Sequence, residues 1–465
     1  MRLLQKMTDF LEDRLELPTL WRGFTDRNLP RGIGWLQTLG SATLFLLLVQ
    51  TATGILLAFY YVPSPEHAFH SVSLIETQLP LGWLIRGIHK WAASLVVLLV
   101  VLHLLRVLYM GAFKYPRELT WVVGVLLLLV VLAFGFTGYL LPWDQRGYWA
   151  TVVGTHIASF APALGPYVME TLRGQPDVGV RTLGRFYAFH TLFLPALLFL
   201  LVAVHVAMVV KQGIAPWPAK KFASVRREEY WKLYQHFKEG GRPFYVSMAK
   251  DAVVALGLLL LVFFLAWKLG APIGEEADPT SATFVPRPEW YFLFLFELLW
   301  WFPGQWIPVA TFWIPAFLIL LLLFLPWLDR SIHRSPLRRP LTTGLTSAFV
   351  LAAIFLTYKG ASAPTPPAAA TAVRARLEQQ ALSPLAQKGR GVYEEQGCAA
   401  CHSIAGAGSA AGPDLTKIAR RRDADWLARF ITAPEKVTPG AEMPAYDGLT
   451  KEELNSLVAY LQTLR

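Results

Sequence analysis

Four histidines lie within long apolar stretches, where ionisable side chains are costly and usually functional. His89 and His103 stand 14 residues apart in one stretch, and His190 and His205 stand 15 apart in another. On α-helices each pair would lie within about 40–60° of one face and roughly 21–22 Å apart along the axis. Two such helices face to face would offer two bis-histidine haem sites, one near each membrane surface. Histidines that only hydrogen-bond within a helix bundle would leave this matched spacing unexplained.

Arginines and glycines recur at positions that fit the same interpretation. Arg86 and Arg106 lie three residues outside the histidines of the first stretch, where they could neutralise haem propionates. Four glycines, each pair spaced by 14, occur in two other apolar stretches: Gly40 and Gly54, and Gly124 and Gly138. Glycine lets a flat macrocycle approach the backbone closely. Glycines in membrane helices are often packing contacts, but the matched spacing favours a role beside haem.

The only two cysteines form a motif near the C-terminal end. Cys398, Cys401 and His402 make a Cys-x-x-Cys-His sequence, which attaches haem through two thioethers and supplies one axial histidine. A redox-active cysteine pair or half a zinc site would not require the histidine, and no second Cys-x-x-Cys exists. The sixth ligand should be Met or His. After His402 the sequence has no other His and one Met, Met443.

The elements that must position these residues are membrane helices. Hydrophobic residues make up 54% and charged residues 16% of the 465 residues, against about 25% charged in soluble proteins. This composition excludes disorder, a coiled coil, collagen and an ordinary cytosolic enzyme. Seven apolar stretches are long enough for the ~20 residues that a bilayer crossing needs. They span residues 33–59, 82–110, 120–141, 185–210, 249–270, 305–328 and 341–358.

Charge patterning predicts the orientation of these helices. A net charge of +11 could indicate a nucleic-acid partner, but the basic residues sit in loops between apolar stretches, so none is expected. The basic loops alternate and share the side of the N-terminus, which the positive-inside rule places in the cytoplasm. Everything after residue 358 would then lie outside a prokaryotic cell membrane. Residues 1–32 are polar and charged, so we expect no cleavable signal peptide.

The predicted fold is all-α: a seven-helix transmembrane bundle with a haem-binding four-helix core, followed by a small all-α domain. We expect four parts: residues 1–215 with four membrane helices, 216–358 with three, a linker 359–382 and a soluble domain 383–465. Residues 361–370 are rich in Ala, Pro and Ser, which is typical of an extended or flexible tether. The final helix, over residues 451–464, is amphipathic and should pack on the first helix of its domain.

Several stretches resemble cytochrome b of the cytochrome bc complexes, the quinol oxidases of respiration and photosynthesis: residues 86–106, 116–121, 138–145 and 185–190. The 15-residue spacing and the stop after seven helices resemble the photosynthetic branch, which splits these helices over two polypeptides after the fourth. Here they are continuous. The C-terminal domain, with residues 412–415 after its motif, resembles the small class I cytochromes c.

The resemblance implies the cofactors and their ligands. Two non-covalent haems b are expected, with His89 and His190 on the outer one and His103 and His205 on the inner one. One covalent haem c is expected in the C-terminal domain, with Met443 as its sixth ligand. The photosynthetic branch binds an extra haem through a cysteine where this chain has Thr38, so no covalent haem is expected in the membrane part.

The resemblance also implies a quinol-oxidation pocket at the outer face. Residues 288–291 read Pro-Glu-Trp-Tyr, a tetrapeptide that lines this pocket in the family. Its carboxylate, Glu289, would accept a proton as quinol is oxidised. A lone Glu beside aromatic residues would otherwise be a solvated or capping residue. Tyr139, Tyr291 and residues 147–150 should form further walls, although Tyr and Trp are also ordinary membrane-interface residues.

These features together predict a fused cytochrome b and c subunit of a quinol:cytochrome c oxidoreductase that contributes to proton translocation. The expected partners are membrane quinol, a Rieske-type iron–sulfur protein, other bc-complex subunits, a soluble cytochrome c or similar acceptor, and a second copy of the chain. A haem-bearing anchor that wires a dehydrogenase to the quinone pool would share the histidines but has no need of residues 288–291. A transporter would not explain haem ligands in both domains.

Overall fold

The computed structural model describes residues 2–16, 25–279, 284, 287–302, 304–362, 382–405, 407–408, 412–438, 441 and 443–464. Within these residues the fold is helical apart from two short strand pairs, so the all-α prediction is confirmed. The chain divides into two compact units, residues 1–277 with 288–360 and residues 278–287 with 361–465. Most of the predicted linker, 359–382, lies outside the described residues.

The first unit contains the predicted membrane helices. In the described chain seven helices are long and apolar enough to span a bilayer: Trp35–Ala58, Gly82–Tyr109, Glu118–Leu140, Val180–Gln212, Phe244–Leu269, Val309–Leu328 and Pro340–Ser362. Each overlaps one predicted stretch. The fourth and fifth begin five residues earlier than predicted, at Val180 and Phe244, because helical hydrogen bonding continues through charged residues where hydropathy stops.

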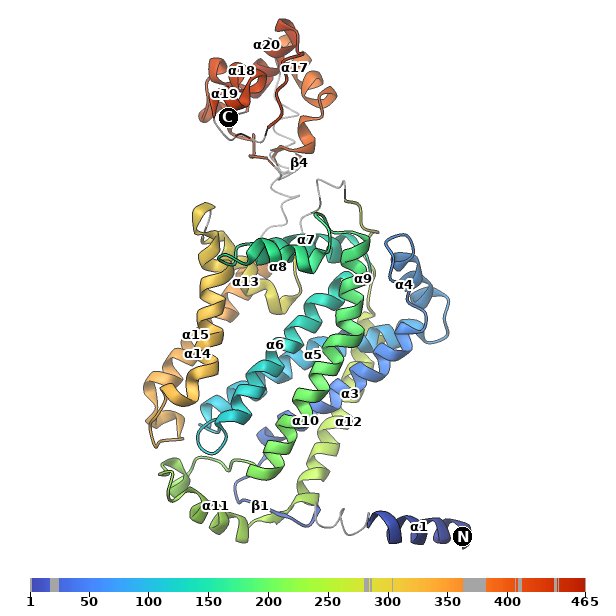
Figure 1. The fold of residues 1–465 in the computed structure, drawn as a ribbon, viewed down its shortest axis with the longest axis vertical. Helices are drawn as coiled ribbons and strands as arrows, with labels where there is room; N and C mark the ends of the chain where they lie inside the picture. Colours follow the sequence, from blue (N-terminus) through green and yellow to red (C-terminus); the bar gives the residue numbers. More distant parts are fainter. Residues whose placement is uncertain are drawn as a thin grey trace. The chain divides into compact units, whose positions relative to one another are not determined.

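Figure 1 labels the α-helices of these spans. They are η1–α3 (Trp35–Thr38, Leu39–Ala58), α5 (Gly82–Tyr109), α6 (Glu118–Leu140), α9–η2–α10 (Val180–Ala188, Phe189–Phe193, Leu194–Gln212), α12 (Phe244–Leu269), η6–α14 (Val309–Trp313, Ile314–Leu328) and α15 (Pro340–Ser362). α3 packs on α5, and α6 packs on α10. The two histidine helices therefore each lie beside one glycine helix, and α12 covers α3 and α5.

Shorter elements surround the spans. They are α1 (Arg2–Leu15), α4 (Ala68–Thr77), α7 (Gln145–Ser159), α8 (Gly165–Arg173), η3 (Lys220–Ala223), α11 (Tyr230–Glu239), η4 (Trp290–Phe292), α13 (Leu293–Trp300), η5 (Gly304–Trp306) and η7 (Pro336–Arg338). Strand β1 (Asn28–Leu29) pairs antiparallel with β2 (Arg242–Pro243), with Asn28 opposite Pro243. This pair closes the end of the unit near α11 (Figure 1).

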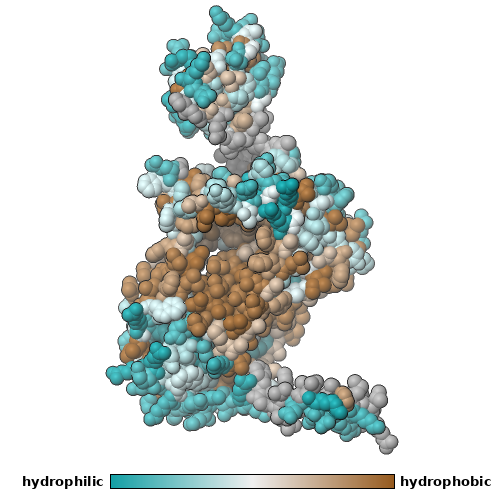
Figure 2. All heavy atoms as spheres, viewed as in Figure 1, coloured by the Kyte–Doolittle hydropathy of each residue, from teal (hydrophilic) through white to brown (hydrophobic). Residues whose placement is uncertain are grey.

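The surface of the first unit fits a lipid environment. On the face shown in Figure 2, apolar side chains form a band around the middle of the unit, with hydrophilic side chains towards both ends. Large apolar side chains are exposed along the spans, including Leu200, Phe317 and Leu351, each more than 60% exposed. Soluble monomeric proteins rarely expose an apolar surface of this extent to water. The unit is an integral membrane domain.

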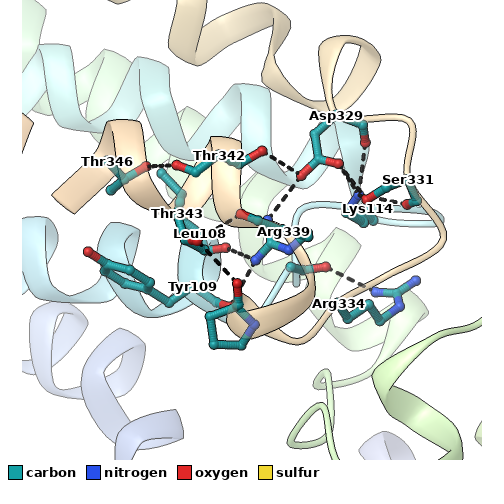
Figure 3. Close-up of polar contacts among 12 residues, drawn as sticks. Leu108, Tyr109, Lys114, Asp329, Ser331, Arg334, Arg339, Thr342, Thr343 and Thr346 are labelled. Carbon is teal, nitrogen blue, oxygen red and sulfur yellow. Dashed lines mark hydrogen bonds and ion pairs between the residues drawn. The ribbon is translucent and has the colours of Figure 1, made fainter. Parts of the chain in front are cut away.

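The basic loops gather at one end of this unit, as their alternation predicts. Figure 3 shows Lys114, from the turn between α5 and α6, bound to Asp329, which follows α14 (Nζ to Oδ1, 2.6 Å). Arg339, just before α15, reaches the other carboxylate oxygen at 3.1 Å. Arg334 donates to backbone carbonyls of the α5–α6 turn at 3.1 and 2.7 Å. The α14–α15 connection is thereby fastened to the α5–α6 turn.

The second unit is a small helical domain. It contains α17 (Pro384–Glu395), η8 (Cys398–Ala400), β3 (Ser403–Ile404) paired with β4 (Ala407–Gly408), η9 (Ile418–Arg420), α18 (Ala424–Thr432), α19 (Pro434–Val437) and α20 (Lys451–Leu461). α20 packs on α17 as predicted. Their backbones cross closely at Gly389, where a Cβ would lie 1.8 Å from the Ser456 carbonyl oxygen.

Candidate functional site

The structure brings the four histidines and four glycines together at two depths. At the outer level, defined by His89, His190, Gly54 and Gly138, the two imidazole centroids are 6.4 Å apart. A Cβ added at Gly54 would lie 3.3 Å from Cε1 of His89, and one at Gly138 would lie 2.6 Å from Cε1 of His190. The glycines therefore leave space that the imidazole rings themselves occupy.

The inner level repeats this arrangement near the basic end. It is defined by His103, His205, Gly40 and Gly124. A Cβ at Gly40 would lie 3.2 Å from Cε1 of His103, and a Cβ at Gly124 would lie 3.4 Å from Cε1 of His205. Each predicted glycine thus faces one predicted histidine. The 14-residue glycine spacing on α3 and α6 equals the His89–His103 spacing and is one residue shorter than the His190–His205 spacing, so each glycine helix meets its histidine helix at both levels.

A π-helical turn holds His190. The fourth span changes from α to π over η2 (Phe189–Phe193) and returns to α at Leu194. Pro195 follows directly, and its ring has no N–H to donate to the carbonyl four residues earlier. A local widening of the helix accommodates this missing bond. The same combination occurs at η6 (Val309–Trp313), two residues before Pro315.

Unpaired buried polar atoms around the two levels fit haem. Among the described residues, Arg86 Nη2 and Arg106 Nε are buried without a hydrogen-bond partner. Arg86 also contacts Glu76 of α4 through Nε at 2.5 Å, a pairing that the sequence did not predict. Buried polar groups are almost always satisfied, and carboxylates such as haem propionates would satisfy these arginines.

The predicted quinol-site residues lie near the outer level. Tyr291, in η4, packs against Gly135 of α6, where a Cβ would lie 2.9 Å from the tyrosine Oη. Burial first, and then the nearby Glu289 carboxylate, raise the pKa of Tyr291 above its ordinary value. Glu289 is half-buried, and its charge also acts on Tyr139. The structure therefore brings Glu289, Tyr291 and Tyr139 into one neighbourhood.

Two further residues of this neighbourhood were missed by the sequence reasoning. Gly135 lies three residues before Gly138, and this short spacing was the available signal. Lys90 follows His89, and Glu289 acts on it electrostatically. A lysine at the edge of an apolar stretch carries no signal of its own, because interfacial lysines are common.

An outer turn supports this neighbourhood. Asp144 caps α7 by accepting from the Gly147 N–H at 2.8 Å, and its second oxygen accepts from the Gly274 N–H at 3.3 Å. The Gln145 N–H donates to the Glu275 carbonyl at 2.8 Å. The turn after α6 and the loop after α12 are therefore fixed to each other, next to Tyr139.

In the second unit the Cys-x-x-Cys-His motif forms a tight turn. Cys398 is half-buried and Cys401 is exposed. The His402 Nδ1–H donates to the Pro413 carbonyl at 2.9 Å, which leaves Nε2 available for a metal. Gly412 lies against this ring, since a Cβ there would be 2.8 Å from Nδ1. These residues fit a histidine ligand of haem iron, because the Pro413 carbonyl and Gly412 fix the orientation of the His402 ring.

The predicted sixth ligand is in the same small core. Met443 packs against the buried cluster of this unit, and so do Cys398 and Tyr446. Burial, followed by the two cysteines, raises the pKa of Tyr446, which places this tyrosine near the motif. Tyr446 was not anticipated.

Thr38 stands where the photosynthetic branch has its haem-binding cysteine. It is buried, and its hydroxyl donates to the Trp35 carbonyl within η1 at 2.7 Å.

Family models match three parts of the chain. "Cytochrome b/b6/petB" matches residues 24–213, "Cytochrome b(C-terminal)/b6/petD" matches residues 276–377, and "Cytochrome c" matches residues 386–465. Because cytochromes are haem proteins, these matches imply that the chain binds haem.

Relatives of known name align with the first half. The cytochrome b subunit of menaquinol:cytochrome c reductase from Bacillus subtilis (strain 168) is 43% identical over 221 residues, 46% of this chain and 99% of that protein. The corresponding Geobacillus thermodenitrificans subunit is 41% identical over 221 residues, with the same coverage of both chains. Cytochrome b6 of Cyanidium caldarium is 45% identical over 212 residues, again 46% of this chain and 99% of that protein.

A solved structure extends the likeness beyond the first half. A chain of "Hyperthermophilic respiratory Complex III" superposes with a TM-score of 0.68 and 29% identity, over 77% of this chain and 92% of that chain. The resemblance to cytochrome b and to a C-terminal cytochrome c is confirmed. The chain belongs to the cytochrome b/b6 family and carries a cytochrome c domain after its membrane helices.

Proposed function

We propose that the chain is the cytochrome b and c fusion subunit of a quinol:cytochrome c oxidoreductase. One observation carries this proposal: two levels of paired histidine and glycine positions between the same four spans, in a chain that also holds a Cys-x-x-Cys-His turn. Menaquinol is the quinol in the names of two relatives, and it is the first substrate to test.

The histidines of the two levels would bind the iron of two non-covalent haems b. Cys398 and Cys401 would hold one covalent haem c, with His402 and Met443 as the ligands of its iron. Haem iron supplies a one-electron couple at each position. Arg86 and Arg106 would orient the propionates, because each keeps a buried nitrogen without a partner among the described residues. Thr38 offers no thiol, so the membrane part carries no covalent haem.

Glu289 is the proposed proton acceptor in quinol oxidation. Quinol must lose two protons as it loses two electrons, and a carboxylate within hydrogen-bond reach can take one of them. Tyr291 is held in place by Gly135 and keeps its proton near neutral pH, since its pKa is raised. It can therefore donate a hydrogen bond to a quinol oxygen. Tyr139 would form a further wall of the pocket.

The proposed setting is a prokaryotic cell membrane, with the N-terminus in the cytoplasm and the cytochrome c domain outside. We retain the division into residues 1–215, 216–358, a linker 359–382 and 383–465. The proposed partners are a Rieske-type iron–sulfur protein that takes the first quinol electron, other bc-complex subunits, and a soluble cytochrome c or similar acceptor. A second copy of the chain would complete a dimer, and the complex would contribute to proton translocation.

Steady-state assay of the purified complex tests this function. Adding menaquinol should reduce an added soluble cytochrome c at a rate that depends on quinol concentration. A matched preparation of the Cys398→Ala variant, which cannot bind haem c through both thioethers, should reduce its own b-type haems with quinol but pass few electrons to the acceptor. A wild-type complex that holds its haems and iron–sulfur protein yet shows no quinol-dependent reduction of the acceptor would contradict the proposal.

A further inference from the structure

Two threonines contact the outer-level histidines directly. Thr53 Oγ1 lies 2.9 Å from His89 Nδ1, and Thr137 Oγ1 lies 3.1 Å from His190 Nδ1. Both threonines are buried, at 8% and 7% exposure. Each precedes the outer-level glycine of its helix, Gly54 or Gly138, so the same residue pair, Thr-Gly, meets both rings.

Each threonine hydroxyl donates its proton to a backbone carbonyl of its own helix. This decides which atom donates in the threonine–histidine hydrogen bonds. Thr53 Oγ1 donates to the Val49 carbonyl at 2.8 Å, and Thr137 Oγ1 donates to the Ala133 carbonyl at 2.9 Å. Each hydroxyl oxygen is therefore left as an acceptor. The histidine Nδ1 must carry the proton, and Nε2 keeps its lone pair for a metal.

The inner level lacks this contact. Its glycines are preceded by Leu39 and Val123, which have no hydroxyl. His103 Nδ1 and His205 Nδ1 are buried and have no hydrogen-bond partner among the described residues. Backbone carbonyls lie near rings at both levels, those of Gln50, Phe134 and Thr120, and the one near His205 does not reach hydrogen-bond geometry. The threonine hydroxyls are thus the side-chain contacts that distinguish the outer level.

We propose that Thr53 and Thr137 are positioning residues that lower the midpoint potential of the outer-level haem. This inference rests on the proposed assignment of a haem to each level. An Nδ1–H that donates to an oxygen makes the imidazole a more basic ligand, which stabilises ferric iron over ferrous iron. The transfer of one electron from ferrous iron at the outer level to ferric iron at the inner level is thereby favoured.

Potentiometric titration of the b-type absorbance in the purified protein tests the proposal. Thr53→Val and Thr137→Val should each raise one of the two b-type midpoints and leave the other in place. A hydrogen bond that stabilises the ferric state more than the ferrous state should change the ferrous-to-ferric ratio by about twofold to tenfold. A tenfold change corresponds to 59 mV for a one-electron couple. Thr53→Ser, which keeps the hydroxyl, should restore the wild-type value.

A control and a converse substitution make the result specific. Thr51 lies on the same helix and bonds only to the Leu47 carbonyl among its described contacts, so Thr51→Val should move neither midpoint. Val123→Thr places a hydroxyl before Gly124 and should lower the inner-level midpoint. If Thr53→Val loses its haem, Val123→Thr still tests the proposal. An inner-level midpoint that stays at the wild-type value in Val123→Thr would then contradict it.

The outcomes separate this inference from the function on which it rests. A wild-type protein that contains no b-type haem would contradict the proposed function itself. A wild-type protein with two b-type midpoints, neither of which moves in Thr53→Val or Thr137→Val, would leave that function standing and overturn the role of the threonines. Equal shifts of both midpoints, in Thr51→Val as well, would indicate a general structural effect and would also overturn it.

Discussion

At the residue scale, the outer level depends on the absence of a Cβ atom at Gly138. The α6 backbone at Gly138 approaches His190 so closely that any side chain would displace the ring. Residue spacing was sufficient to predict Gly138 and His190 at one haem level, because the glycines stand 14 residues apart and the histidines 15. It could not predict how closely the glycine approaches the imidazole, since that depends on the rotation of α6 against α10.

Gly138→Ala should therefore remove the outer-level haem. The new methyl would lie 2.6 Å from Cε1 of His190, and overpacking of this kind costs about 1–3 kcal/mol. We expect the b-type absorbance of the purified protein to fall by about half. Gly184→Ala is the matched control, since a Cβ there meets nothing within 4 Å, and it should keep the full absorbance. Full absorbance in Gly138→Ala would refute the tight contact.

Glu289→Gln should slow quinol oxidation without disturbing any haem spectrum. The amide keeps the shape of the side chain but cannot take a proton, and a positioned general base contributes about 10²–10⁴-fold in rate. Turnover with quinol should fall, while the b- and c-type absorbance stays as in the wild type. Unchanged turnover between about pH 6 and 8 would remove the carboxylate from the mechanism.

Met443→Ala should affect only the C-terminal haem. Thioether sulfur raises the potential of haem iron, so replacing it should lower the haem c midpoint and abolish the near-infrared methionine-to-iron band. Cys398 and Cys401 should still retain the haem covalently, and quinol should still reduce the b-type haems. Survival of both the band and the midpoint would show that Met443 is not the ligand.

At the element scale, hydropathy was enough to predict seven spans but not how their ends are fastened. The ion network of Lys114, Asp329 and Arg339 joins two loops that are more than 200 residues apart in the chain. Loop charges alone predicted only which side they share. The π turns were also beyond prediction, because a proline in an apolar stretch can kink, end or widen a helix, and only the packing around it decides which.

Asp329→Asn should destabilise the membrane unit substantially. Asp329 has a side-chain exposure of 6%, and Lys114 and Arg339 have 8% and 1%. Removing the carboxylate leaves two buried cations without their counter-charge, a change that typically costs about 3–5 kcal/mol. Thermal unfolding in detergent should show a clear loss of Tm at pH 7. The control is Asp13→Asn, which breaks an exposed pair with Arg14 and should change Tm little.

The same network predicts a pH dependence. Burial alone would raise the pKa of Asp329, but hydrogen bonds from Lys114, Ser331 and Arg339 outweigh it and lower the pKa from 3.8 to about 2. A carboxylate with a lowered pKa stabilises the fold above its unfolded pKa, and this contribution is lost as the pH falls from about 4 towards 2. The Tm difference between wild type and Asp329→Asn should narrow over that range. A constant difference would contradict this account.

At the scale of the whole molecule, two electron-transfer modules share one chain. Their motifs could be recognised in the sequence because the proposed haem ligands are few and recur at fixed spacing. The neighbourhood of Glu289 was harder to predict, since it combines η4, α5 and α6. Its contacts, such as Tyr291 on Gly135, join segments far apart in the sequence, and α12, which lies between them in the chain, packs on α3 and α5.

The haem inventory tests the central claim most directly. Pyridine haemochrome spectra of the purified chain should give two haems b for each haem c, because four membrane histidines form two levels and one Cys-x-x-Cys-His turn exists. After acid-acetone extraction only the c-type spectrum should remain on the protein. His89→Ala and His103→Ala should each remove one haem b and leave the other. A b-to-c ratio of 1:2, with a second covalent haem in the membrane unit, would contradict the account.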